Sequence, residues 1–521
     1  MRALIAIVVA IGVLLFAISS LQNKSTETAA EKGSTLMVFC AAGIKKPVAK
    51  IAEDYEKEFG VTIQLQYGGT GTLLSQILVA KHGDIFIAAD DGAVESARER
   101  DAVKEAIKLA IQYPVIGVKK GNPKNIKSFD DLLREDVRVA IANPEAASIG
   151  KRTQKAAGDR WEKLQKHVTV MKPTVTELAA DLTVGSIDAA VIWNSTTPQF
   201  KELEAIEVPE FNNQKDNVSA TVLTACQKPQ AALKFGRYLI APEKGGKVFK
   251  EMGFKVHQGD AWAEKPEMIL YSGGVNRPAV EILLTQFAER EGITLSTVFN
   301  GCGILCASMQ AMTNSANPKF PDAYYACDLC FVPPVAEHFP ESVLLTETEI
   351  GIAVRKGNPK KIKTLADLAQ PGLKVGLCNA EQSTLGFMTQ GMLKSSALHD
   401  SIRKNVVVEV PTADFLVNQM RAGALEAAIV YKVNYQLQEE HLEFIKIDHE
   451  GAKAVQPFSV RGDSPNRQLA GRLLEYLVNN RSSFEATGFT WTGDQAAIKS
   501  KDIEVPPWLK PDAQQEVKDS K

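Results

Sequence analysis

Cysteine, histidine and surplus charge are all scarce in this sequence of 521 residues. Seven cysteines are too few for a scaffold held together by disulfides, and the seven histidines form no closely spaced metal-binding pair. Lys and Arg number 60 against 62 Asp and Glu, so the basic excess typical of a nucleic-acid-binding protein is missing. The sequence also lacks a P-loop lysine motif, a nucleophile–base pair, paired carboxylates and a cofactor fingerprint. We therefore expect neither an enzyme nor a bound cofactor.

Long hydrophobic runs are absent apart from one near the start of the chain. Residues 3–18 carry no charge, follow Met1 and Arg2, and precede small polar residues. This order is typical of an export signal, and the run is nearly long enough for a membrane anchor. We predict a signal peptide or membrane anchor over residues 1–22 and a polar linker over 23–34. The protein is then periplasmic or otherwise extracytoplasmic, and close to the inner membrane if the segment is retained.

The chain repeats itself once. Residues 117–128 recur in a close variant as 353–364, and residues 185–193 recur as 423–431. Other matching segments keep the same order, which indicates a tandem duplication rather than a short-period repeat. The predicted divisions are a first domain over residues 35–257, a linker over 258–266, a second domain over 267–491 and a polar tail over 492–521.

Strand and helix patterns alternate within each copy. Residues 36–40 form a short apolar run typical of a buried parallel strand, and residues 47–59 have helical spacing that Gly60 ends. A strand over 61–65, a helix over 72–80 and a strand over 84–88 follow. The pattern predicts an α/β fold with doubly wound parallel sheets, whose ligands lie at the carboxyl ends of the strands.

Small residues stand where strands lead into helices. Three such turns, at residues 41–43, 68–72 and 143–150, contain Gly, Ala, Ser or Thr, and no Lys or Arg lies in 68–72. Free N–H groups at helix N-termini bind anions without a cationic side chain, and small side chains let the anion approach the backbone. These turns favour a small oxyanion, and the alternative is that they are ordinary connections between strands and helices.

The segments around these turns resemble those of a known protein family. The segments Phe39-Cys40-Ala41-Ala42-Gly43, 67–73, 83–90 and 189–193 are similar to those of the periplasmic molybdate-binding proteins of ABC transporters. The resemblance implies two tandem type II periplasmic-binding-protein units, each a two-lobed clamshell of doubly wound sheets. It also implies a solute-binding protein that captures a tetrahedral oxyanion, molybdate or tungstate, for uptake through the membrane permease of an ABC transporter.

The same resemblance implies which residues surround the anion. Trp193 replaces a tyrosine of the family, and an indole N–H can still donate a hydrogen bond. Glu177 lies where some tungstate-binding relatives place a carboxylate, whereas the position of a second carboxylate is Ala147 here. We favour a solvated helix residue as the interpretation of Glu177. The residues expected at the first-domain site are Ala42, Gly43, Gly69, Thr70, Ser148, Ile149, Val175, Thr176 and Trp193.

The second copy departs from this pattern. Cys302 stands at the position of Thr70, Phe415 replaces Glu177, and Tyr431 keeps the tyrosine of the family. These changes suggest a different ligand or a weaker site. The corresponding second-domain residues are Gly273, Gly274, Cys302, Thr384, Leu385 and Tyr431.

Four cysteines cluster in the second copy, at positions 302, 306, 327 and 330. Cys302 follows one predicted strand and Cys327 ends the next, so both lie at the carboxyl edge of the sheet. In an exported protein we expect a disulfide between Cys302 and Cys327, because disulfides persist in oxidising compartments. Zinc binding and unpaired buried thiols are the alternatives, and no metal ligand is assigned.

Two functions therefore remain open. The first is delivery of molybdate or tungstate to a permease. The alternative is a membrane-anchored anion sensor or partner-docking module in which the second copy binds no oxyanion. Neither involves nucleic acid.

Overall fold

The computed structural model describes residues 33–312, 317–436 and 438–504. They form two compact units, one ending at Glu264 and the other beginning at Lys265. The predicted N-terminal signal or anchor lies outside the described residues. Among the helices that the structure describes, none is both long enough and apolar enough to cross a bilayer.

The first unit consists of two lobes, of which the first has a six-stranded sheet of order β11-β4-β10-β3-β1-β2. β1 is parallel to β2 and β3, whereas β10 is antiparallel to β3 and β4. The elements are β1 (Thr35–Ala41), α2 (Lys45–Phe59), β2 (Thr62–Gly68), α3 (Thr70–Ala80), β3 (Ile85–Ala88), α4 (Asp91–Arg98), β4 (Val103–Gln112), β10 (Asp216–Leu223), α8 (Pro229–Ile240), α9 (Gly245–Glu251) and β11 (Lys255–Val256).

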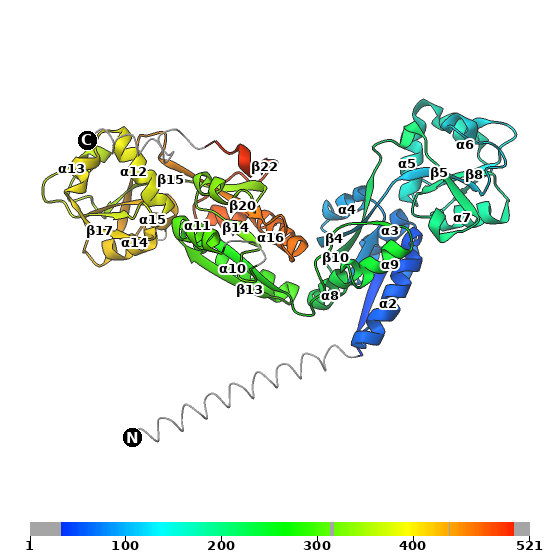
Figure 1. Ribbon diagram of the computed structural model, residues 1–521, viewed down its shortest axis with the longest axis horizontal. Helices are drawn as coiled ribbons and strands as arrows, with labels where there is room; N and C mark the ends of the chain where they lie inside the picture. Colours follow the sequence, from blue (N-terminus) through cyan, green and yellow to red (C-terminus); the bar gives the residue numbers. More distant parts are fainter. Residues whose placement is uncertain (1–32, 313–316, 437, 505–521) are drawn as a thin grey trace, which may run out of the picture. The chain divides into compact units, whose positions relative to one another are not determined.

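The inserted lobe lies between β4 and β10 in the chain, and Figure 1 shows its helices around β5 and β8. Its five-stranded sheet has the order β7-β6-β8-β5-β9. The elements are β5 (Pro114–Lys119), β6 (Val139–Ala142), α5 (Ser148–Ala157), α6 (Trp161–His167), β7 (Val170–Lys172), α7 (Val175–Val184), β8 (Ala189–Trp193) and β9 (Leu203–Ile206).

Local sequence accounts for these elements. Leu36, Val38 and Phe39 of β1 are at most 2% exposed, as expected of a strand covered on both faces. α2 buries one apolar stripe and ends at Gly60, whose φ of 69° is left-handed and suits glycine.

The second unit repeats this order with one difference. β15 is a single strand of 15 residues that pairs with β20 in one sheet and with β18 in the other. In the first unit the corresponding stretch of chain is divided into two strands, β4 and β5. The position of Ile350 is occupied there by Pro114, which has no N–H to donate to a neighbouring strand.

The strands of the second unit follow the order β13-β12-β14-β20-β15-β18-β16-β17, and β19, β21 and β22 also pair with β15. The strands are β12 (Glu267–Gly273), β13 (Thr294–Asn300), β14 (Ala323–Tyr325), β15 (Glu341–Arg355), β16 (Val375–Cys378), β17 (Val406–Val410), β18 (Ala427–Tyr431), β19 (Leu442–Lys446), β20 (Lys453–Val460), β21 (Thr490–Trp491) and β22 (Ile498–Lys499). The helices are α10 (Arg277–Glu291), α11 (Cys302–Ala311), α12 (Thr384–Ser395), α13 (His399–Arg403), α14 (Ala413–Arg421), α15 (Lys432–Gln436), α16 (Arg467–Asn479) and α17 (Arg481–Ala486).

The predicted fold class is confirmed, since each unit has two α/β lobes. Two details differ. The sheets are mixed rather than wholly parallel, because the chain returns from the inserted lobe along an antiparallel strand. Residues 498–500, which fall in the tail predicted over 492–521, are packed in the second unit: β22 pairs with β15, and the buried Ser500 hydroxyl lies 2.8 Å from that of Ser342.

Candidate functional site

Three helices of the first unit begin where the two lobes meet. α3 of the first lobe begins at Thr70, and α5 and α7 of the inserted lobe begin at Ser148 and Val175. The first N–H groups of a helix have no acceptor inside that helix, and they carry its partial positive charge. Helix N-termini that converge in this way can bind an anion, although the Gly71 and Thr72 N–H groups of α3 already donate to the carbonyl of Ala146.

Two hydroxyls connect the lobes at this point. The Ser148 hydroxyl donates to Thr70 Oγ1 at 3.0 Å, and both residues are buried. Next to them, the Gly71 N–H donates to the carbonyl of Ala146 at 3.0 Å. The predicted residues Thr70 and Ser148 therefore share one buried polar contact between the lobes.

Glycines permit this close approach. A Cβ on Gly69 would lie 2.3 Å from the carbonyl oxygen of Ala146 and 2.6 Å from that of Pro173, both in the inserted lobe. A Cβ on Gly43 would lie 3.0 Å from Val175 Cγ1 and 3.8 Å from Trp193 Cδ1. Gly43, Gly69, Val175 and Trp193 are thus brought to one inter-lobe contact region.

Other predicted residues lie at the edge of this region. Ile149 is the buried second residue of α5, and Ala42 is the buried first residue of the short turn after β1. The Thr176 hydroxyl lies 3.0 Å from that of Thr174, the capping residue of α7. The exposed Glu177 carboxylate accepts a hydrogen bond from Thr174 Oγ1 at 2.9 Å, which fits its interpretation as a solvated helix residue.

The second unit has the same convergence with different side chains. α11 begins at Cys302 and α12 begins at Thr384, and the buried Tyr431 ends β18. A Cβ on Gly301 or Gly303 would lie 2.1 Å or 2.0 Å from carbonyl oxygens of the opposite lobe. Leu385 is the buried second residue of α12, as Ile149 is in α5.

Cys302 and Cys327 lie together, but the predicted disulfide is not formed in this structure. Their Sγ atoms are 3.1 Å apart and both thiols are free, whereas a disulfide bond measures about 2.0 Å. Burial tends to raise the pKa of Cys302, yet hydrogen bonds from Cys327, Tyr324 and Thr384 bring it below the usual value. The hydrogen bond to Cys302, together with burial, raises the pKa of Cys327, so Cys302 is the more acidic thiol. Among the described residues, no group of three or more His, Cys, Asp or Glu is arranged for a metal ion.

One residue of the second cleft was missed from the sequence. Strand pairing places Thr35 opposite Thr62 and Glu267 opposite Thr294. Because β1 and β12 then correspond residue by residue, the counterpart of Gly43 is Val275 rather than Gly274. Val275 is buried and carries a branched side chain at the position where Gly43 carries none. Gly43 and Val275 lie equally far from the first residues of β1 and β12, and this spacing could have revealed in the sequence that they correspond.

A cavity of about 330 Å³ adjoins the second cleft. Its lining includes Gly274, Asn300, Thr412 and Phe415, whose ring is exposed.

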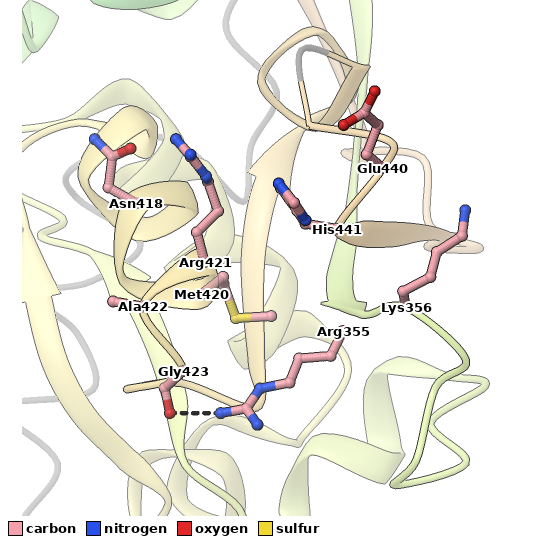
Figure 2. A pocket seen from close by; sticks show the side chains of 9 residues that line it. All are labelled: Arg355, Lys356, Asn418, Met420, Arg421, Ala422, Gly423, Glu440 and His441. Carbon is pink, nitrogen blue, oxygen red and sulfur yellow. Dashed lines mark hydrogen bonds between the residues drawn. The ribbon is translucent and has the colours of Figure 1, made fainter.

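A larger hollow of about 810 Å³ lies elsewhere on the second unit, and its lining includes Arg355, Lys356, Arg421 and His441 (Figure 2). Figure 2 shows the hydrogen bond that Arg355 Nη2 donates to the carbonyl oxygen of Gly423; the two atoms are 2.5 Å apart. Arg355 is five residues along β15 from Ile350, the partner of Tyr431, which is roughly 16 Å of extended strand. This basic hollow is therefore separate from the cleft.

Comparisons with known proteins place the chain among binding proteins. The family described as bacterial extracellular solute-binding protein matches residues 36–255 and 269–490. A binding protein of Haemophilus influenzae is 27% identical over 43% of this chain and 91% of its own length. The molybdate-binding protein ModA of Mycobacterium tuberculosis is 23% identical over 42% of this chain and 84% of its own. The periplasmic molybdate-binding protein of Azotobacter vinelandii is 16% identical, with a TM-score of 0.38 over 43% of this chain and all of that one.

Proposed function

This chain belongs to the bacterial extracellular solute-binding protein family, and from that membership we propose that its first unit captures a tetrahedral oxyanion, molybdate or tungstate, for uptake by an ABC transporter. The permease of that transporter is the proposed partner. Relatives of the chain are binding proteins, including one described as an ABC transporter substrate-binding lipoprotein of Bacillus subtilis, which agrees with a role without catalysis.

The buried contact between Thr70 and Ser148 carries the proposal. It joins two helix N-termini from opposite lobes in a region whose predicted site residues include no Lys or Arg. Neutral donors fixed in a desolvated cleft stabilise a compact anion, and the cleft size then selects among oxyanions. An anion held by both lobes couples binding to lobe closure.

Isothermal titration of the full chain with molybdate, tungstate and sulfate tests this function. We expect tight binding of molybdate or tungstate in the first unit and weaker binding of sulfate. Thr70→Asp should reduce the affinity by about 100-fold or more, because a carboxylate would face the anion. The matched control Ser75→Asp adds the same charge to an exposed position of α3 and should leave affinity within about twofold. Absence of heat and of thermal stabilisation with all three anions would refute the proposal.

A second candidate is a membrane-anchored anion sensor or docking module whose second unit binds no oxyanion. Val275 and Cys302 favour it, since they replace Gly43 and Thr70. In the same titrations, two oxyanion sites per chain would argue against this candidate.

A further inference from the structure

The second cleft contains a pair of thiols that has no counterpart in the first. Cys302 occupies the position of Thr70, and the strand register places Cys327 at the position of Ala89. The two Sγ atoms are 3.1 Å apart, and the residues are 0% and 5% exposed. Both residues belong to the same lobe, so the pair exists whether or not the lobes close.

The surrounding backbone makes room for the second sulfur. A Cβ on Gly273 would lie only 2.2 Å from Cys327 Sγ. The first unit has Ala41 at the position of Gly273 and has no sulfur at Ala89. Gly273 and the Cys327 thiol thus occur together in the second unit, as expected if this site is built around the Cys327 sulfur.

Two buried hydroxyls of the opposite lobe, those of Thr384 and Tyr431, lie close enough to the thiols to interact with them. The Tyr431 hydroxyl has no hydrogen-bond partner, and Thr384 Oγ1 has none apart from its interaction with the two thiols. Tyr431 is 3% exposed and Thr384 is 0% exposed. Thr384 is close enough to Cys302 and Cys327 to lower the pKa of both thiols. Buried hydroxyls are normally satisfied, so a ligand that bonds both is the natural occupant of this cleft.

We propose that the reduced second cleft binds a trivalent, thiol-seeking oxyacid of the arsenite class, As(OH)₃. Cys302 and Cys327 hold the arsenic, and Thr384 and Tyr431 bond its remaining hydroxyl. The proposal concerns the second cleft alone and is independent of which oxyanion the first unit binds.

The binding step balances without an oxidant. The sulfur of Cys302 attacks arsenic through its thiolate, the stronger nucleophile, and forms an S–As bond while one As–OH bond breaks. The thiol proton leaves with that hydroxide as water. Cys327 repeats the exchange, so two thiols and As(OH)₃ give one dithiolate As–OH species and two molecules of water. Arsenic remains trivalent throughout, and soft thiolate sulfur is the ligand type that such a centre prefers.

Other ligands fit this pair less well. A tetrahedral zinc ion about 2.3 Å from each sulfur requires the two sulfurs to be roughly 3.8 Å apart, which is more than the observed 3.1 Å. A pyramidal centre has narrower bond angles and accepts a shorter spacing between the sulfurs. The nearby Asp328 carboxylate already accepts hydrogen bonds from the N–H groups of Cys330 and Val455. A tetrahedral oxyanion in the second cleft would find Cys302 in place of the Thr70 hydroxyl and Val275 in place of Gly43.

Sodium arsenite is the probe for the test. The full chain is reduced, desalted under nitrogen and titrated, and bound arsenic is measured by elemental analysis after a second desalting. We expect one retained arsenic per chain. Cys302→Thr and Cys327→Ala, which copy the first unit, should each weaken binding by about 100-fold, because the second S–As bond is then no longer formed intramolecularly. Tyr431→Phe should weaken it by about tenfold, as expected for one lost hydrogen bond.

Cys226→Ser is the matched control, since it removes a buried thiol of the first unit and should leave arsenic retention unchanged. Circular dichroism confirms that each variant is folded, and molybdate titration of the same variants reports separately on the first unit. Failure of the reduced chain to retain arsenic, or full retention by the Cys302→Thr/Cys327→Ala double variant, would overturn the proposal.

Discussion

At the residue scale, closure of each unit depends on positions that cannot carry a side chain. Gly69 faces two backbone carbonyls of the opposite lobe, and backbone cannot move aside as a flexible side chain can. Thr70, Ser148 and Trp193 can meet only if this contact forms. The φ of Gly69 is −66°, which any residue can adopt. Glycine is therefore required here because of the limited space between the lobes.

Gly69→Ala should weaken oxyanion binding by about 100-fold while leaving each lobe folded, because its methyl group prevents closure. Small-angle scattering and titration with and without molybdate would measure closure and affinity together. The control is Gly471→Ala in α16, where a Cβ meets nothing within 4 Å and helix propensity improves by about 1 kcal/mol. Full ligand-induced compaction of the Gly69 variant would contradict the prediction.

At the element scale, an ion pair fastens the inserted lobe to the strand that returns from it. Arg152 of α5 donates through Nε and Nη2 to the carboxylate of Asp216, the first residue of β10. The Asp216 side chain is fully buried. Burial raises the pKa of Asp216 above its usual value, and Arg152 opposes that rise.

Arg152→Met should destabilise the first unit by about 3 kcal/mol at pH 7, because it leaves a buried carboxylate without its counter-ion. The pKa of Asp216 then rises further. A carboxyl whose folded-state pKa is raised stabilises the fold at pH values below its unfolded pKa and loses that effect as the pH rises through the folded one. The deficit should therefore shrink as the pH falls from 7 toward 4.

Urea unfolding at several pH values measures this dependence. The control is Arg134→Met, which removes an exposed ion pair with Asp136 and should cost much less stability than Arg152→Met at any of these pH values. Equal losses for both variants, or a deficit that grows on acidification, would contradict the role assigned to Arg152.

At the scale of the whole molecule, each unit has cores of its own. The first unit has one core in each lobe, and the core of the second unit is built from residues 268–491. No apolar core of the described residues draws on both units, which is the usual condition for independent folding.

Residues 33–264 and 265–504 produced separately should each unfold in a cooperative transition by scanning calorimetry. The first fragment should keep the oxyanion affinity of the full chain within about twofold, because distant independent sites act additively. A fragment that remains unfolded, or an affinity lost on separation, would show that the units depend on one another.

The sequence alone determined what local patterns encode: the duplication, the strands and helices, and the turns that begin α3, α5 and α7. Apolar runs, glycine stops and small residues act within a few positions, so β1, α2 and the Thr70 turn were predictable from them. Only the tertiary structure decided which distant groups meet. The contact of Gly69 with Ala146, the ion pair of Arg152 with Asp216 and the correspondence of Gly43 with Val275 depend on strand register and lobe packing. The same holds for the free thiols of Cys302 and Cys327, because a 3.1 Å approach across 25 residues is set by the fold around them.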